Sequence, residues 1–264
     1  MTHYSRSELS PPELDAEVPD WNNCYDPTLV NCFTPQENPK LHDSNVSLNT
    51  VFEKLLEHYG PQDWWPGDSP LEIMIGAVLT QNTSWKNVEK AIANLKEASL
   101  MHLERLHKTK VEELAEIIRP SGYYRLKAKR LSNLVDYAMT RYDGDLEWMF
   151  SHDVTSLREE LVAINGIGPE TADSILLYAG NKETFVVDTY TARILKRHGW
   201  IEWEADYHQI QDHFVSQVPA EVEHYNEFHA LIVRTGNEFC RKTPKCDGCP
   251  LECYLPAGGI LEPE

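Results

Sequence analysis

The feature that most constrains the fold is a glycine hairpin at positions 164–172, which reads Ile-Asn-Gly-Ile-Gly-Pro-Glu-Thr-Ala. Gly166 and Gly168 let the backbone turn tightly and expose consecutive N–H groups. The runs before and after it, 159–164 and 171–178, both have helical patterns. A dinucleotide-binding turn would need a third glycine and a preceding strand. The sequence therefore predicts a helix, a hairpin and a helix, whose N-terminal N–H groups suit a phosphate of DNA or of a nucleotide.

A lone acid follows this hairpin. Asp188 lies sixteen residues after Ala172 and directly behind the apolar run Phe185–Val187. A carboxylate in an apolar setting near a phosphate-binding turn suggests chemistry on a nucleic acid. The alternative is that Asp188 caps a helix that begins at Thr189, which is a frequent use of aspartate. Both roles are compatible, because capping fixes the side chain without removing its charge.

The charge balance argues against nucleic-acid binding when it is taken over the whole chain. The 264 residues carry a formal net charge of -18, whereas phosphate contacts need lysine and arginine. The distribution of charge weakens this objection. Residues 1–50 hold eight acidic residues against Arg6 and Lys40, but residues 105–141 hold nine basic residues against four acidic ones. We expect a local basic surface, and DNA binding that weakens steeply with salt.

The remaining patterns predict an all-α protein. Residues 1–45 form an irregular acidic extension, and no apolar run is long enough to cross a membrane. No secretory signal is present, so we expect a cytoplasmic protein, or a nuclear one in a eukaryote. After an apolar helical face at Val51, Leu55 and Leu56, the expected helices are 71–79, 87–95, 111–118, 128–142, 156–164, 170–178, 189–197, 207–218 and 223–235.

Four cysteines near the C-terminus predict a metal site. Cys240, Cys246, Cys249 and Cys253 lie within fourteen residues, a compact spacing that favours a [4Fe–4S] cluster, with zinc as the alternative. Arg241 and Lys242 lie between the first two ligands, where they either contact a phosphate backbone or are simply solvated. The distant Cys24 and Cys32 are interpreted as ordinary thiols, with a redox role as the alternative.

Together these motifs resemble the endonuclease III branch of the helix-hairpin-helix DNA glycosylases over residues 48–253. The segment 79–83 resembles the family's wedge, in which Gln81 would fill the space of a displaced base. Gly122 and Tyr123, followed by Lys127 and Lys129, resemble the loop that intrudes beside the orphaned partner base. The hairpin with Thr171, the segment of Asp188 with Arg193, and the cysteine tail match in the same order.

The resemblance implies two helical lobes with a groove between them. Residues 68–180 would form a six-helix domain that ends in the helix-hairpin-helix motif. Residues 46–67 and 181–255 would form the second lobe with the cluster loop. Asp188 and the hairpin would face each other across the groove. The cysteine spacing is shorter than the family's usual one, which leaves zinc open.

The same resemblance implies a mechanism. A base in a duplex must be flipped out, and Asp188 would stabilise the positive charge that develops on the sugar. Members of the family that also cut the strand carry a lysine where this chain has Glu170. A glutamate cannot form the Schiff base, so we expect a monofunctional glycosylase that uses water.

Substrate choice follows from three tryptophans. Trp64, Trp65 and Trp85 are predicted to stack on an electron-poor flipped base such as an alkylated purine, as in the similar 3-methyladenine glycosylases; core packing is the alternative. Competing functions are a glycosylase/lyase acting on oxidised pyrimidines and a non-catalytic DNA-binding or redox-sensing protein. The expected partner is double-stranded DNA with a damaged base, bound by a monomer without membrane association.

Overall fold

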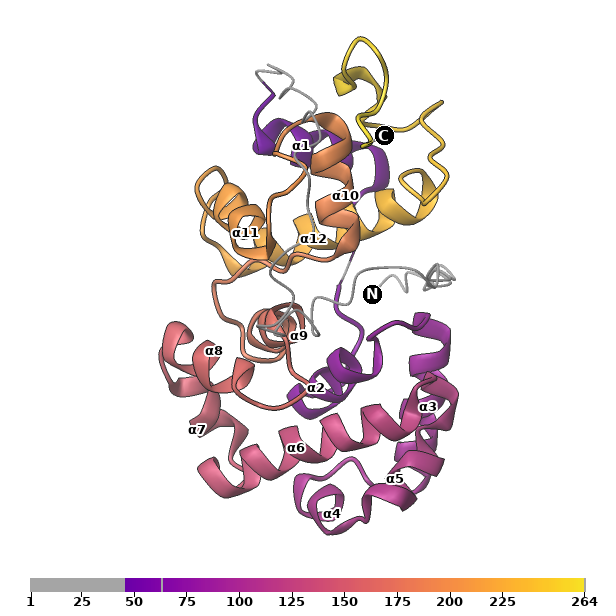
Figure 1. Ribbon diagram of the computed structural model, residues 1–264. Helices are drawn as coiled ribbons and strands as arrows, with labels where there is room; N and C mark the ends of the chain where they lie inside the picture. Colours follow the sequence, from indigo (N-terminus) through magenta and orange to yellow (C-terminus); the bar gives the residue numbers. More distant parts are fainter. Residues whose placement is uncertain (1–45, 63, 264) are drawn as a thin grey trace, which may run out of the picture.

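The computed structural model describes residues 46–62 and 64–263, and within them every regular element is a helix. The helices form two lobes, one above the other in Figure 1, each around its own apolar core. The all-α prediction is therefore confirmed. The acidic extension 1–45, with Cys24 and Cys32, lies outside the described residues. None of the described helices is long and apolar enough to span a membrane.

The lower lobe is built around the long helix α6. Its core joins apolar residues of α2, α3 and α6 with those of the shorter helices around them. Helix α2 is the most deeply placed, because eight of its ten residues are buried. The helices of this lobe are α2 (Pro70–Leu79), α3 (Trp85–Glu97), α4 (Leu103–Lys108), α5 (Val111–Ile117), α6 (Tyr124–Tyr142), α7 (Leu146–Ser151), α8 (Val154–Val162) and α9 (Pro169–Ser174).

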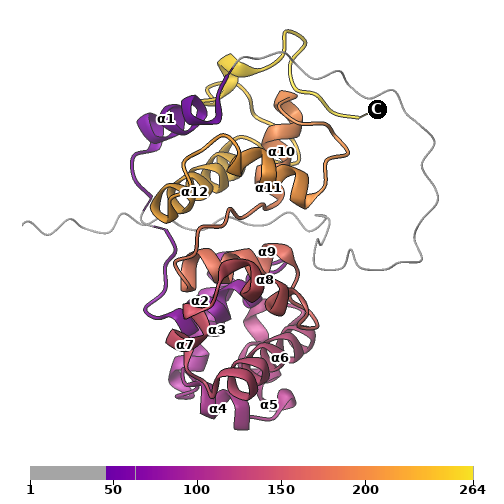
Figure 2. The ribbon, with the colours of Figure 1, turned by 90° about the vertical axis from the view of Figure 1, so that its left-hand side faces the viewer.

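The upper lobe joins segments from both ends of the described chain. Helix α1 (Leu48–Tyr59) precedes the lower lobe in sequence, yet it lies against the C-terminal helix α12 (Val222–Glu238), as Figures 1 and 2 show. Helices α10 (Thr189–His198) and α11 (Tyr207–Val215) complete this lobe, and the cysteine tail follows α12. Three short helical turns, η2 (Arg119–Ser121), η3 (Ile175–Ala179) and η4 (Glu252–Tyr254), join the longer elements.

The helix that follows the hairpin connects the two cores. Helix α9 continues directly into η3, which has π-helical hydrogen bonding. Ile175 and Leu176 belong to the lower core, whereas Leu177 and Tyr178 belong to the upper core. A wider turn changes which faces the side chains occupy, so one helix serves both lobes. The exact domain boundaries predicted from the sequence stay a prediction.

Two short helices were not predicted, and the limits of most predicted helices shift by one to three residues, with larger differences in two of them. Helices α4 and α7 have six residues each, too few for an apolar period to emerge. Helix α6 begins at Tyr124 rather than at Ala128, because Tyr123 before it adopts a left-handed conformation with φ 41°. The predicted helix 170–178 is divided into α9 and η3.

Candidate active site

Asp188 is the N-cap of α10, and the cap uses only one of its carboxylate oxygens. Oδ1 accepts hydrogen bonds from the Thr191 N–H at 2.7 Å and from the Thr191 hydroxyl at 2.8 Å. The strand-like run Phe185–Val187 before it is fully buried and anchors the segment in the upper core. The Asp188 side chain keeps 13% of its surface exposed. The carboxylate is thus fixed, largely desolvated and still accessible at one oxygen.

His229 faces that second oxygen. Its Nε2 lies 3.8 Å from Oδ2 of Asp188, and its Nδ1 is 2.5 Å from the hydroxyl of Tyr178. His229 comes from α12 and Tyr178 from η3, so three elements meet at this point. Burial lowers the pKa of His229 and raises the pKa of Tyr178, so the imidazole is neutral and the phenol protonated at pH 7.

Sequence reasoning missed both of these residues. His229 lies in an apolar stretch of α12, where a lone histidine is indistinguishable from a core residue. Tyr178 ends the helix after the hairpin and looks equally like packing. The one sequence feature that pointed to Tyr178 was its position in the helical segment that follows the hairpin. Their role becomes visible only when the fold brings α12 against η3 and the start of α10.

The three predicted tryptophans do lie together, next to Tyr178. The Trp65 ring centroid is 4.9 Å from that of Tyr178, 5.3 Å from that of Trp64 and 5.1 Å from that of Trp85. Trp85 is buried in the lower core, whereas Trp64 and Trp65 are partly exposed. Trp65 packs against both cores. An aromatic wall therefore lies between the lobes, with Trp85 behind it.

The glycine hairpin joins α8 to α9 in the lower lobe. Gly166 has φ +96°, and a Cβ at this position would lie 2.2 Å from Cγ of Arg130, so only glycine fits. Gly168 is the N-cap of α9, and Thr171 in its first turn is buried. The helix-hairpin-helix predicted from the sequence is present at these positions.

Gln81 is buried, and its side-chain amide is hydrogen-bonded to the hairpin. Its amide nitrogen donates to Oγ1 of Thr171 at 2.9 Å and to the carbonyl of Gly166 at 3.3 Å. Its carbonyl oxygen accepts a hydrogen bond from Arg130. Gln81 therefore acts as a buried amide here, and its predicted contact with DNA stays a prediction.

The predicted intruding loop presents its tyrosine to solvent. Tyr123 is 71% exposed, and Gly122 before it has φ +67°. Lys129, one turn along α6, is also exposed. Exposed Tyr123 and Lys129 are thus available to a nucleic acid.

The buried position of Lys127 disagrees with its predicted contact with DNA. The side chain is only 1% exposed, and Nζ donates to the carbonyls of Leu79 and Ser121 at 2.9 and 2.6 Å. Burial, together with nearby Arg130, lowers the pKa of Lys127 to about 7. Its position on α6 faces the core, because residues 127, 131 and 135 recur at the helical period. Lys127 connects α2 to the loop before α6 and does not reach solvent.

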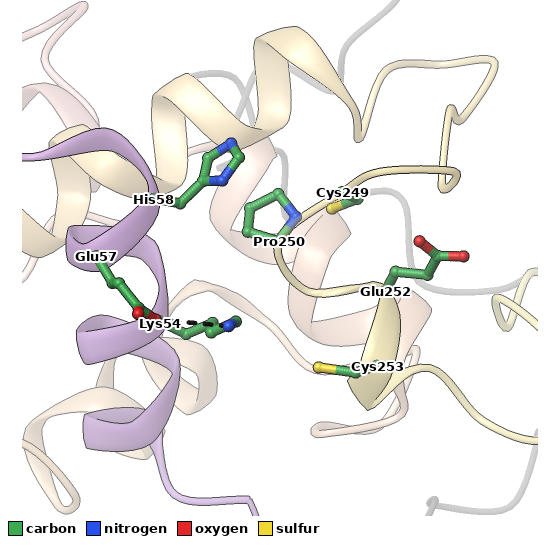
Figure 3. Close-up of a pocket in the computed structure, with 7 residues that line it drawn as sticks. All are labelled: Lys54, Glu57, His58, Cys249, Pro250, Glu252 and Cys253. Atoms are coloured by element: carbon green, nitrogen blue, oxygen red, sulfur yellow. Dashed lines mark ion pairs between the residues drawn. The ribbon is translucent and has the colours of Figure 1, made fainter.

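The four cysteines line two cavities beside α1 and α12. Cys249 and Cys253 point into a cavity of about 830 Å³ that Lys54 and His58 of α1 close from the other side (Figure 3). Cys240, Cys246 and Cys249 line a neighbouring cavity of about 20 Å³. Thiol donors of this kind suit an iron–sulfur cluster or zinc. Among the described residues, no three metal-ligating side chains lie close enough to hold an ion as they stand.

Arg193 is partly exposed and also supports this tail, so its predicted contact with DNA stays a prediction. Its guanidinium donates to the carbonyl of Cys240 at 2.8 Å. Arg197, one turn later on α10, donates to Sγ of Cys240 and to the carbonyls of Arg241 and Lys242. The side chains of Arg241 and Lys242 are exposed, as their predicted role requires.

Comparison with known proteins places this geometry in a family. Residues 75–220 match the model of the HhH-GPD superfamily of base excision DNA repair proteins. The chain belongs to that superfamily. It is 48% identical over 204 residues to the "Putative DNA repair glycosylase" of Methanocaldococcus jannaschii, covering 76% of this chain and 92% of the relative. The protein is therefore a DNA N-glycosylase of base excision repair.

One solved structure supports the same assignment, and a second one shares the fold. The Helicobacter pylori 3-methyladenine DNA glycosylase bound to 1,N6-ethenoadenine is 31% identical and has a TM-score of 0.62, covering 72% of this glycosylase and 95% of that chain. An endonuclease III–DNA complex shares the fold, with a TM-score of 0.69, 23% identity and coverage of 80% and 94%. The predicted resemblance to the endonuclease III-like glycosylases is confirmed.

The hairpin of the glycosylase carries a glutamate, Glu170. Glu170 is the second residue of α9 and is partly buried. Burial is the main cause of the raised pKa of Tyr178, and the negative charges of Asp188 and Glu170 add to it. The nearest lysine after the hairpin, Lys182, donates to the carbonyl of His152 at 2.9 Å. The hairpin itself, residues 164–172, contains no amine nucleophile.

Proposed function

We propose that this glycosylase is monofunctional: it releases a damaged base by water attack and leaves an abasic site. The observation that carries the proposal is the pairing of a fixed carboxylate at Asp188 with a hairpin that holds Glu170 and no lysine. A carboxylate can stabilise a cationic sugar and activate water, whereas strand cleavage through a Schiff base needs an amine.

The step is a substitution at C1′ of the damaged nucleotide. The N-glycosidic bond breaks and its electron pair leaves with the base, while an oxygen of water forms the new bond to C1′. Asp188 stabilises the positive charge of the sugar and takes the proton of the attacking water. A cationic alkylated purine leaves as a neutral molecule, so it needs no proton from the protein. A neutral base would need a separate proton donor.

Alkylated purines are the proposed substrate class. Trp64 and Trp65 present indole rings at the junction of the lobes, next to Tyr178 and hence near Asp188. An electron-rich ring face attracts a cationic base more than a neutral one. The structural relative that acts on 3-methyladenine supports this choice. Glycosylase/lyase action on oxidised pyrimidines is the second candidate.

We further propose that the enzyme acts as a monomer on double-stranded DNA that carries the damaged base, in the nucleoid or nucleus. The hairpin of Gly166 and Gly168 would hold a backbone phosphate. Exposed Tyr123 and the Gln81 segment would fill the space that the flipped base leaves. Arg241 and Lys242 would contact the backbone beside the cysteine tail.

The cysteine tail is proposed to hold a [4Fe–4S] cluster through Cys240, Cys246, Cys249 and Cys253. When bound, the cluster would order the tail and supply a centre that can change its charge by one electron. Protein purified without oxygen should contain iron and sulfide and absorb visible light broadly. A colourless protein with one zinc per chain would establish the alternative.

The deciding experiment uses duplexes that each carry one lesion: an alkylated purine, an ethenoadenine or an oxidised pyrimidine. We expect release of the alkylated purine, intact strands, and no covalent complex after borohydride reduction. Asp188→Asn serves as the control and should release little base. Borohydride trapping of the wild-type enzyme would establish the lyase instead. Equal base release by wild type and Asp188→Asn would contradict the proposal.

A further inference from the structure

We propose that His229 is a positioning residue for Asp188. A hydrogen bond from Tyr178 would fix the orientation of its imidazole. The Nε2–H would then point at Oδ2 of Asp188, the carboxylate oxygen that the helix cap does not use. This inference rests on the proposed function, because it assigns the device that prepares Asp188 for catalysis. It concerns a residue that no family motif of the sequence contains.

The tautomer of His229 follows from its contact with Tyr178. The Tyr178 hydroxyl is fully buried, so the phenol keeps its proton and donates it to Nδ1 across 2.5 Å. An imidazole that accepts at Nδ1 and is neutral carries its own proton on Nε2. Asp188 brings a negative charge toward the ring, and the Phe185 ring packs against it with a centroid distance of 6.3 Å.

The Nε2–H is the atom that lacks a partner. It is fully buried, and within residues 46–62 and 64–263 it makes no hydrogen bond. Leaving a buried donor unsatisfied costs about 1–3 kcal/mol. Oδ2 of Asp188 lies 3.8 Å away, beyond hydrogen-bond distance by about 1 Å, so a small approach or one bridging water would satisfy it.

The arrangement would hold the carboxylate at both ends. Thr191 fixes Oδ1, and His229 would fix Oδ2, so the plane of the carboxylate is set before the sugar arrives. Tyr178 touches Trp65 on its other side, so the aromatic wall and the carboxylate share one support.

The kinetic test is a double-mutant cycle measured as single-turnover base release. His229→Leu should slow the step about tenfold or more, with the same affinity for uncleavable lesion DNA. His229→Gln should keep most of the rate, because its amide can accept from Tyr178 and donate to Asp188. In the Asp188→Asn background, His229→Leu should have no further effect. His224→Gln, at a partly buried histidine of the same helix that packs on Phe52, is the matched control.

A spectroscopic readout separates this inference from the proposed function. In ¹⁵N NMR spectra, His229 should show a protonated Nε2 and a bare Nδ1, and Asp188→Asn should shift the Nε2 signal. This result stands even if no lesion tested is a substrate, so inactivity alone would overturn only the proposed function. A protonated Nδ1, or an additive loss of rate in the double variant, would overturn the role of His229. An equal loss of rate in His224→Gln would do the same.

Discussion

At the scale of the residue, the helix cap uses one carboxylate oxygen of Asp188, and the proposed catalytic role would use the other. An aspartate at a helix start usually serves the helix, and here Oδ1 does so through Thr191. Asparagine is an equally good cap, so Asp188→Asn keeps the geometry and removes the charge. We expect base release to fall about a hundredfold or more while the melting temperature stays within error. Asp188→Ala should lose the rate and also about 1 kcal/mol of stability.

The measurement is single-turnover base release beside thermal unfolding of each variant. Unchanged release by Asp188→Asn would show that the carboxylate is only a cap. A large loss of stability in that variant would show that the charge itself holds the upper lobe together.

Tyr123 permits a second prediction at this scale. Because its side chain is 71% exposed, Tyr123→Ala should leave unfolding unchanged. Affinity for a duplex with an abasic site should fall by about 1–3 kcal/mol, the usual contribution of an aromatic ring stacked on a base. Trp148 is the control, since it is also exposed and lies beyond the other end of α6. Equal losses for Tyr123→Ala and Trp148→Ala, measured by fluorescence anisotropy, would contradict a specific contact.

The sequence alone identified candidate residues that belong to a motif, and it missed those whose role depends on burial. Asp188 and the glycine hairpin were found because spacing and residue type suffice. Lys127 was misplaced, because a lysine in a basic stretch looks exposed until the phase of its helix is known. His229 was missed because its partners come from two other elements, which no local pattern brings together.

At the scale of the element, the helix α9–η3 carries the junction between the lobes. Asp173 on α9 is fully buried, and it accepts two hydrogen bonds from Arg158 at 2.7 and 2.9 Å. Tyr207 and Gln211 of α11 donate to it from the upper lobe at 2.7 and 3.0 Å. One carboxylate therefore ties α8, α9 and α11 together, beyond what the shared core residues provide.

Removing this charge should loosen the junction. Asp173→Asn leaves Arg158 with an uncompensated, partly buried charge, and breaking such a buried pair costs about 3–5 kcal/mol. We expect the denaturation midpoint to fall accordingly in a urea titration followed by circular dichroism. Glu159→Gln, at an exposed carboxylate on α8, should leave the midpoint unchanged. A midpoint that shifts equally in both variants would show that Asp173 contributes no specific tie.

The elements also show where pattern reasoning stops. Long helices such as α6 and α12 display their apolar period over several turns, so they were predicted. The π-helical turn η3 was not, because its cause is tertiary. Leu176 must reach one core and Tyr178 the other, and only the packing of both lobes on this helix imposes that requirement.

At the scale of the whole molecule, an acidic protein must bind an acidic polymer through a local surface. The net charge is -18, and residues 105–141 hold nine basic residues, of which all but Lys127 and Arg130 are exposed. We expect the logarithm of the DNA affinity to fall linearly and steeply with the logarithm of the salt concentration. Exposed Lys129 should contribute one phosphate contact, so Lys129→Gln should reduce the magnitude of this slope by about 0.9. Lys90→Gln, at an exposed lysine of α3 outside every motif, should leave the slope unchanged in the same anisotropy titration.

The upper lobe should also lose stability in mild acid. Burial lowers the pKa of three histidines on α11 and α12, namely His213, His224 and His229. Below the ordinary histidine pKa of 6.5 the unfolded chain therefore takes up protons that the folded chain refuses. The free energy of unfolding should be constant above this pH and should fall as the pH drops from about 6.5 toward the lowered values.

Urea midpoints measured at intervals between pH 7.5 and 5.5 test this dependence. His224→Gln should flatten the curve, because it removes a group that must stay neutral in the folded state. His208→Gln should not, because His208 is an exposed histidine of α11 whose replacement leaves His213, His224 and His229 in place. Hydrogen exchange locates the effect: amides of α11 and α12 should lose protection in acid before those of α6, because the three histidines all lie in the upper lobe. Equal acid sensitivity of both lobes would assign the loss to carboxylates distributed over the molecule.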